Sequence, residues 1–326
     1  MYFFASTFKN SIEWSVTGTA LYYICSIDQY ATPLAKYALQ FPDILRFFTF
    51  AIVYFQHAAV FLLFFPFYNR AVRTVTACLL MLMHFSFAMG SYLGIFSWIA
   101  IAALLAFLPS LVWDYAGDTL ATRTSKIARA MYAMINPVQR PVHIARASTH
   151  KSRVAQYSLA SLGVLYIAFI FLWQATDFVS VSRLVPGWST LEIAANVLRI
   201  DQRWNLFAPR PYVNDGWDIV EGHLADGRTV DLFRAGSPIS YEKPADVYGL
   251  YGSSHLREYT LEFRRGSNAQ YRPFYAAYTC AQWNATHTGA DRLQSLEALF
   301  MLELTPPPGM PQTPIRKQSL ITYDCL

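Results

Sequence analysis

The stretch FFTFAIVYFQHAAVFLLFFPF, residues 47–67, decides the fold class. Its 21 residues include no Asp, Glu, Lys or Arg. Because a helix needs about 20 apolar residues to cross a hydrocarbon layer about 30 Å thick, this stretch is long enough to span a membrane. Two further charge-free stretches, 74–112 and 154–176, contain 39 and 23 residues. The longer one provides two spans if the chain turns near Gly90 and Gly94, so the sequence predicts about four complete spans.

The composition agrees with a membrane protein. Charged residues make up 14% of the 326 residues, whereas a soluble domain has about 25%. Hydrophobic residues make up 54% and aromatic residues 16%, more than one core can hide from water. Residues 1–198 contain 13 basic and 7 acidic side chains, and residues 199–326 contain 13 and 14. The apolar excess therefore lies in the first part, and lipid is the expected partner there.

The basic residues predict an orientation, because cytoplasmic loops are rich in Lys and Arg. Arg70 and Arg73 follow the first predicted span. Seven more basic residues lie in the loop before the last span: Arg123, Lys126, Arg129, Arg140, Arg146, Lys151 and Arg153. Both loops are expected in the cytoplasm. The chain after about residue 177 is then expected on the opposite face.

The last third of the chain has the pattern of a folded domain. Residues 269–284, AQYRPFYAAYTCAQWN, place aromatic side chains at helical spacing. Four segments alternate as half-buried strands do: WDIVEG (217–222), TVDLFR (229–234), YTLEFR (259–264) and LFMLEL (299–304). The predicted fold is an all-α transmembrane helical bundle over residues 1–180 with a C-terminal α+β extracytoplasmic domain over 181–305. The Pro-rich residues 306–326 are expected to form a linker and tail.

Cysteines and charge exclude several classes of protein. The four cysteines form no CxxC pair and no Cys/His cluster with ligand spacing, so no metal is expected. A net charge of +5 without a separate basic domain makes nucleic acid an unexpected partner. Cys280 and Cys325 are candidates for a disulfide if their domain lies in an oxidising compartment and the tail reaches. Cys78, within a span, is expected to be a reduced core residue.

Three polar side chains fall in apolar surroundings, where each is costly: Lys9, His57 and His84. A lysine in an apolar site has a lowered pKa, because desolvation penalises the ammonium, and it can then act as a base. The alternative for Lys9 is a side chain that reaches from a helix end to the membrane interface. The alternative for the histidines is a hydrogen-bonded core residue.

A second candidate site follows the last predicted span, in the segment IDQRWNLFAPRPYVNDGW, residues 200–217. It gathers arginines and aromatic rings where the chain leaves the bilayer: Arg203, Trp204, Arg210 and Trp217. Such a group can bind an anionic headgroup or cover a membrane cavity. The alternative is a rigid strut between the bundle and the C-terminal domain.

Three ordered motifs resemble one family. They are KNSIEWSVTGTALYYICSIDQYATP (9–33), MHFSFAMGSYLGIF (83–96) and WNLFAPRPYVNDGW (204–217) with ADGRTVDL (225–232) after it. Together they resemble the horizontally transferred transmembrane (HTTM) domain, a bacterial membrane family similar to vitamin K-dependent gamma-carboxylase. The match enters that domain partway at Met1, so the resemblance also implies spans before it. An inner-membrane location follows from the same resemblance.

The resemblance implies a quinol-dependent oxygenase or a carboxylase-like lyase. Lys9 falls on the base that deprotonates a vitamin K-like quinol, and His84 on a histidine that lines the site. Trp14, with Arg203, Trp204, Arg210 and Trp217, then shapes the quinol-binding site. The alternative is a non-catalytic membrane anchor or assembly subunit, whose extracytoplasmic domain binds another protein.

Overall fold

The computed structural model describes residues 1–326 except 110–111, 114–152, 177–184 and 326. The chain forms two compact units. One comprises Met1–Ala5 and Leu108–Leu206, and the other Ser6–Phe107 and Phe207–Leu326. Most of the predicted basic loop, and the predicted domain boundary at residue 180, lie outside the described residues.

The described residues of the first unit between Leu108 and Leu206 include two long helical segments. The longer, α9 (Arg153–Ala175), has 23 residues, and α11 is Trp188–Leu198. The rings of Trp173 and Trp188 stack with their centroids 5.8 Å apart. Most of the apolar side chains of α9 before Trp173 are exposed, as in a helix surrounded by lipid.

The second unit begins with helices of very different lengths. The two long ones are α5 (Pro42–Leu63) and α6 (Asn69–Gly90), which pack on each other. α6 also packs on α7 (Phe96–Leu104), which continues as the 3-10 helix η1 (Leu105–Phe107). Four short helices precede them in the chain: α1 (Tyr2–Thr7), most of which belongs to the first unit, α2 (Ile12–Ser15), α3 (Ala20–Ser26) and α4 (Pro33–Ala38). Residues 18–40 therefore contain two short helices, α3 and α4.

Three of the described helices are long and apolar enough to cross a membrane. They are α5, α6 and the part of α9 from Tyr157 to Ala175. The turn predicted near Gly90 is confirmed, because α6 ends there. The apolar helix that follows covers only Phe96–Phe107 and is shorter than a span. The predicted count of four spans is not confirmed.

The C-terminal part of the second unit is built on an antiparallel sheet of order β3-β2-β1-β4-β5. Its strands are β1 (Asn214–Leu224), β2 (Thr229–Asp231), β3 (Ser237–Pro238), β4 (Leu293–Leu304) and β5 (Arg316–Asp324). Short 3-10 helices lie between them: η2 (Leu232–Arg234), η3 (Gly249–Tyr251), η4 (Gly266–Tyr271) and η5 (Gly289–Asp291). The prediction that strands and helices are combined in the C-terminal part is confirmed, and its sheet is antiparallel.

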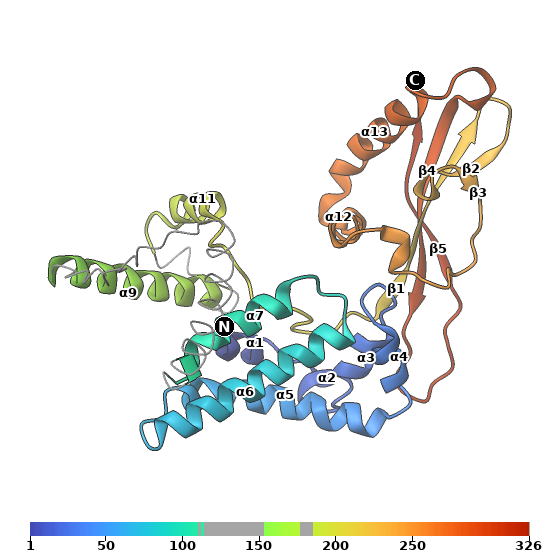
Figure 1. The fold of residues 1–326 in the computed structure, drawn as a ribbon. Helices are drawn as coiled ribbons and strands as arrows, with labels where there is room; N and C mark the ends of the chain where they lie inside the picture. Colours follow the sequence, from blue (N-terminus) through green and yellow to red (C-terminus); the bar gives the residue numbers. More distant parts are fainter. Residues whose placement is uncertain (110–111, 114–152, 177–184, 326) are drawn as a thin grey trace, which may run out of the picture. The chain divides into compact units, whose positions relative to one another are not determined.

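Both faces of the central strands are covered. The helix α13 (Arg272–Asn284) packs through Ala276 and Cys280 on one face. On the other face Trp217 packs with Tyr251 and Leu299. Because both faces are covered, β1 is buried at eight of its eleven positions, including the polar Asp215 and Asp218. Figure 1 shows α12 (Ser254–Arg264) and α13 on the same side of the sheet.

Gly216 has a structural reason to be glycine. Its φ is +140°, and a Cβ atom there would lie 2.0 Å from the carbonyl oxygen of Met301 on β4. Only glycine lets β1 approach β4 this closely. The Gly216 carbonyl also accepts a hydrogen bond from Gln29 Nε2 at 2.7 Å.

Several predictions need correction. Residues 259–264, expected as a strand, lie in α12, which Ser253 caps by accepting a hydrogen bond from the backbone N–H of Leu256 at 3.2 Å. The expected tail contains β5, which pairs with β4 along most of its length. Cys78 is exposed on α6 and is not a core residue. Cys280 and Cys325 form the proposed disulfide, with Cα atoms 5.5 Å apart.

Candidate functional site

Lys9 lies in the loop between α1 and α2 and points to the middle of α5. Its Nζ donates a hydrogen bond to Gln56 Oε1 at 3.3 Å. The same Nζ lies 5.3 Å from the centroid of the Trp14 ring, within the range of a cation–π interaction. These two contacts place the lysine ammonium against a neutral amide and an aromatic face.

Gln56 links this lysine to α6. Its side chain is buried, and Nε2 donates to Met83 Sδ at 3.7 Å. The next residue on α6 is His84, which is also buried. Its ring makes edge contacts with Phe87 and with Phe96 of α7, each at 5.8 Å between centroids. The contacts from Lys9 therefore reach the turn of α6 that carries His84.

The environment of Lys9 favours its neutral form. Burial lowers the pKa of the Lys9 ammonium from its ordinary value of 10.5 to about 8, because desolvation penalises the charge. An amine with such a pKa is present partly in its neutral form near neutral pH. It can then accept a proton, which an ordinary surface lysine does poorly.

Trp14 fixes the loop that carries Lys9. Its side chain is buried, and Nε1 donates a hydrogen bond to the carbonyl oxygen of Phe207 at 3.0 Å. Phe207 packs in the same cluster, with its ring 5.6 Å from that of Tyr30. The segment after the predicted last span thus does reach the Lys9 region, through Phe207.

The four residues of the second candidate site, Arg203, Trp204, Arg210 and Trp217, are divided between the two units. Arg203 lies over the Trp173 ring at 5.7 Å, and the backbone N–H of Trp204 donates to Gln174 Oε1 at 3.4 Å, both within the first unit. In the second unit, Arg210 pairs with Glu13 at 3.1 Å, next to Trp14. Trp217 is fully buried in the sheet core. Of the four residues, only Arg210 is brought close to the Lys9 loop by a described contact.

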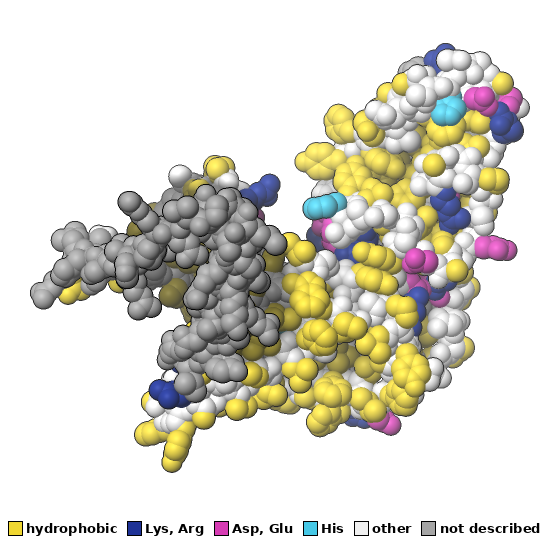
Figure 2. Space-filling view, viewed as in Figure 1, with side chains coloured by type: hydrophobic (Ala, Val, Ile, Leu, Met, Phe, Trp, Pro, Cys, Tyr) yellow, Lys and Arg dark blue, Asp and Glu magenta, His cyan; other side chains and the backbone are white. Residues whose placement is uncertain are grey.

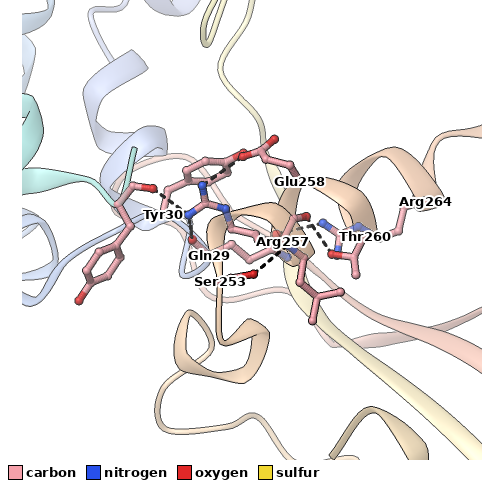
Figure 3. Close-up of polar contacts among 9 residues, drawn as sticks. Gln29, Tyr30, Ser253, Arg257, Glu258, Thr260 and Arg264 are labelled. Carbon is pink, nitrogen blue, oxygen red and sulfur yellow. Dashed lines mark hydrogen bonds and ion pairs between the residues drawn. The ribbon is translucent and has the colours of Figure 1, made fainter. Parts of the chain in front are cut away.

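A second polar cluster joins the helices to the C-terminal domain, and no sequence pattern indicated it. Arg257 of α12 is buried and donates from Nη1 to the carbonyl oxygens of Gln29, at 3.2 Å, and Tyr92, at 2.8 Å. Its guanidinium lies 4.2 Å from the centroid of the Tyr30 ring and pairs with Glu258. Figure 3 shows this side chain pointing from α12 into the loop between α3 and α4.

Arg264 lies about two turns after Arg257 on the same face of α12 and completes this cluster. Its Nη1 donates to Asp218 Oδ2 at 2.8 Å, and its Nη2 donates to Gln29 Oε1 at 3.0 Å. Gln29 is therefore held by both arginines and by the backbone of β1. A loop of the helical part is fixed to both α12 and the sheet.

Charged side chains form a network beside these contacts. Asp28 bonds Lys36 and Lys243, each at 2.6 Å, and Lys243 also pairs with Glu303. The backbone N–H of Asp28 donates to Asp215 Oδ2 at 2.7 Å. Burial raises the pKa of the Asp215 carboxyl to about 7, and the nearby Asp28 charge acts in the same direction.

The carboxylates of this network are close enough to hold a cation. One oxygen each from Asp28, Asp215 and Glu303 lie within 4.8 Å of one another. Both oxygens of Asp28, however, are bonded to lysine ammonium groups. The two lysines provide the positive charge that a metal would supply, so we assign an ion-pair network here and no metal centre.

The sequence pointed to Lys9, Trp14 and His84 but missed Gln56 as a partner. Gln56 could have been identified from its position in an apolar stretch, because burying an uncharged amide there is costly. Searches against protein-family models, curated proteins and solved structures find no match to this chain.

Proposed function

We propose that this chain is an integral membrane protein that oxidises a quinol, with Lys9 as the base. The observation that carries the proposal is the contact of the Lys9 ammonium with Gln56 and Trp14 beside two membrane-length helices. The family resemblance gives the substrate class, and it supports an oxygenase or carboxylase reaction driven by this step. It also supports a bacterial inner membrane with the C-terminal domain outside the cytoplasm.

The residues around Lys9 and His84 suit a quinol. A quinol ring is flat and apolar with two hydroxyl groups, so it needs apolar walls and a few placed hydrogen-bonding groups. Trp14, Met83 and Phe96 provide the apolar surface. Ser97 follows Phe96 on α7, is fully buried, and its hydroxyl has no hydrogen-bond partner among the described residues. A ligand hydroxyl would satisfy it.

The chain's own groups can handle the proton. Oxidation of one quinol by one O2, the oxidant that the resemblance implies, would transfer two electrons and two protons and give a quinone and hydrogen peroxide, and Lys9 would carry one of the two protons. The neutral Lys9 amine accepts a proton and becomes an ammonium. Gln56 Oε1 then accepts a hydrogen bond from that ammonium, which holds its position. With a pKa of about 8, roughly a tenth of the lysine is neutral at pH 7.

Replacement of Lys9 by Arg tests this proposal. Arginine keeps the positive charge but stays protonated, so it cannot act as a base. In vesicles containing equal amounts of protein, Lys9→Arg and Lys9→Ala should both reduce oxygen-dependent oxidation of a menaquinol analogue by about 10²–10⁴-fold. Lys317→Arg, at an exposed lysine on β5, is the matched control and should keep full activity. Full activity in Lys9→Arg, or no oxidation by the wild type, would reject the enzyme and leave the anchor.

The anchor alternative is favoured by a different observation. A non-catalytic subunit that binds another protein needs an apolar patch on its C-terminal domain. α13 carries exposed aromatic side chains that form such a patch. What covers that patch therefore bears on the choice between the two functions.

A further inference from the structure

An aromatic row runs along the outer face of α13. Tyr271, Phe274 and Tyr278 are spaced by three and four residues, so they lie on one side of the helix. They are 59%, 72% and 62% exposed. On the opposite side of the helix, Ala276 and Cys280 are buried against the sheet. The row is therefore not needed for the core of the domain.

The row continues onto α12. Tyr259 is also exposed, and its ring lies 5.9 Å from that of Tyr275. Figure 2 shows hydrophobic side chains gathered at this edge of the C-terminal domain. Clustered exposed aromatic rings on a folded domain usually mark a surface that another body covers.

Within the second unit, the helix that carries the row lies on the side of the sheet toward which α5 and α6 extend. Figure 1 shows α5 and α6 extending from the base of the sheet to the side that α12 and α13 cover. In this view α12 and α13 lie above the ends of α5 and α6 nearest the sheet, at about the same position along the direction in which α5 and α6 run. The contacts of Arg257 and Asp28 fix the domain to the loops at those ends. A bilayer around α5 and α6 would therefore have its surface beside α13.

We propose that the aromatic row Tyr271, Phe274 and Tyr278 docks onto the lipid surface, so that the C-terminal domain lies flat on the membrane. Tyrosine suits this place because its ring enters the apolar layer while its hydroxyl stays among water and headgroups. The exposed apolar side chains of α5, which include Phe48 and Tyr54, are the part of this unit that the same bilayer would surround. The inference rests on the proposed membrane insertion of α5 and α6, but not on quinol chemistry.

A spin label at position 274 tests the docking. The full chain, with Cys25→Ser and Cys78→Ser to remove the free thiols, carries one added cysteine as Phe274→Cys. Matched labels are Ser319→Cys on β5, whose neighbour Leu299 belongs to the other sheet face, and Tyr54→Cys in the middle of α5. In vesicles of phosphatidylcholine and phosphatidylglycerol, collisions with oxygen report lipid and collisions with a nickel chelate report water.

The label at 274 should resemble the one at 54, with a ratio of oxygen to nickel collisions several-fold higher than at 319. Nickel access at 274 equal to that at 319, with 54 still in lipid, would overturn the docking and leave the insertion intact. A label at 274 shielded from both reagents would mean that protein covers the row, which also overturns the proposal. Nickel access at 54 would overturn insertion and docking together.

Discussion

Two lysines in the same unit have opposite electrostatic surroundings. Burial penalises the ammonium of each. At Lys9 the contacts include the amide of Gln56 and the ring of Trp14, and burial lowers the pKa to about 8. At Lys243, hydrogen bonds to the carboxylates of Asp28 and Glu303 outweigh burial and raise the pKa. The first arrangement produces a base, and the second produces a permanent cation.

The difference separates a reactive region around Lys9 from a fastening region, the ion-pair network of Lys243, Asp28, Asp215 and Glu303 that joins the helices to the C-terminal domain. Neutral partners do not compensate a buried ammonium for its lost hydration. Its pKa therefore falls, and it can release and take up a proton near neutral pH. Charged partners make the same group part of the structure. Arg257 extends the fastening region, since it connects α12 to the loops that carry Gln29 and Tyr92. We therefore expect mutations in the two regions to act on different properties.

The largest effect on stability is expected at Arg257. Arg257→Ala leaves the buried carbonyl groups of Gln29 and Tyr92 without this donor and removes the packing on Tyr30. The loss should be about 3–5 kcal/mol, because a buried charge-assisted network is broken from one side. Thermal unfolding followed by circular dichroism in detergent should show a midpoint lower by roughly 10 °C.

Arg265→Ala is the matched control for Arg257. Arg265 lies at the end of the same helix, is exposed, and pairs with exposed Glu262 at 3.3 Å. Exposed ion pairs of this kind contribute about 0–1 kcal/mol. Equal losses in the two variants would mean that the Arg257 contacts do not hold the domain in place.

A smaller, pH-dependent effect is expected at Lys9. The native pKa of about 8 lies below the ordinary value of 10.5, so between these values the unfolded chain binds a proton that the native state lacks. Stability should therefore rise as the pH rises through this window, and the full penalty should be present below pH 8. Lys9→Met has no such group and should be more stable than the wild type at pH 7 by about 2 kcal/mol.

The advantage of Lys9→Met should shrink as the pH approaches 10, and unfolding midpoints at pH 7, 8.5 and 10 measure it. Lys243→Met is the comparison, because it leaves the carboxylates of Asp28 and Glu303 without their shared cation. That variant should be less stable than the wild type at all three values. A Lys9→Met variant destabilised at pH 7 would show that the Lys9 charge is needed by the fold.

The sequence predicted the long apolar helices and the central strands where one physical rule dominated. Length without charge identified α5, α6 and α9, and alternation identified β1 and β4. The same alternation gave a wrong prediction for residues 259–264, because so short a pattern fits a strand and a helix equally well. Tyr259 and Phe263 are four residues apart, and their rings pack on the same side of α12. β5 was missed because RKQSLITYD is polar at its start and follows a Pro-rich stretch.

The candidate site was predicted in part, for a related reason. Lys9 and His84 were found because burial of a polar group in an apolar segment is costly. Arg257 and Asp215 lie in segments of ordinary polarity, and their partners are far away in the chain. Arg257 is separated from Gln29 by 228 residues, and Asp215 from Asp28 by 187. Composition within a segment carries no information on pairs at such separations.

Asp215, the buried carboxyl of the fastening region, should show a pH dependence of stability opposite to that of Lys9. Its native pKa of about 7, above the ordinary 3.8, means that the native state binds a proton more tightly than the unfolded chain. Its contribution to stability is therefore full below pH 4 and falls as the pH rises to 7. Asp215→Asn stays neutral, and its amide oxygen can still accept from the backbone N–H of Asp28. This variant should equal the wild type near pH 4 and exceed it at pH 8 by up to about 4 kcal/mol, which is what a shift of about three pKa units corresponds to. Unfolding midpoints across that range measure the difference, with the exposed Asp324→Asn as control.

If Asp215→Asn is instead less stable than the wild type at pH 8, the Asp215 carboxylate is charged in the native state. Asp215 would then resemble Lys243, as one more fixed charge in the ion-pair network.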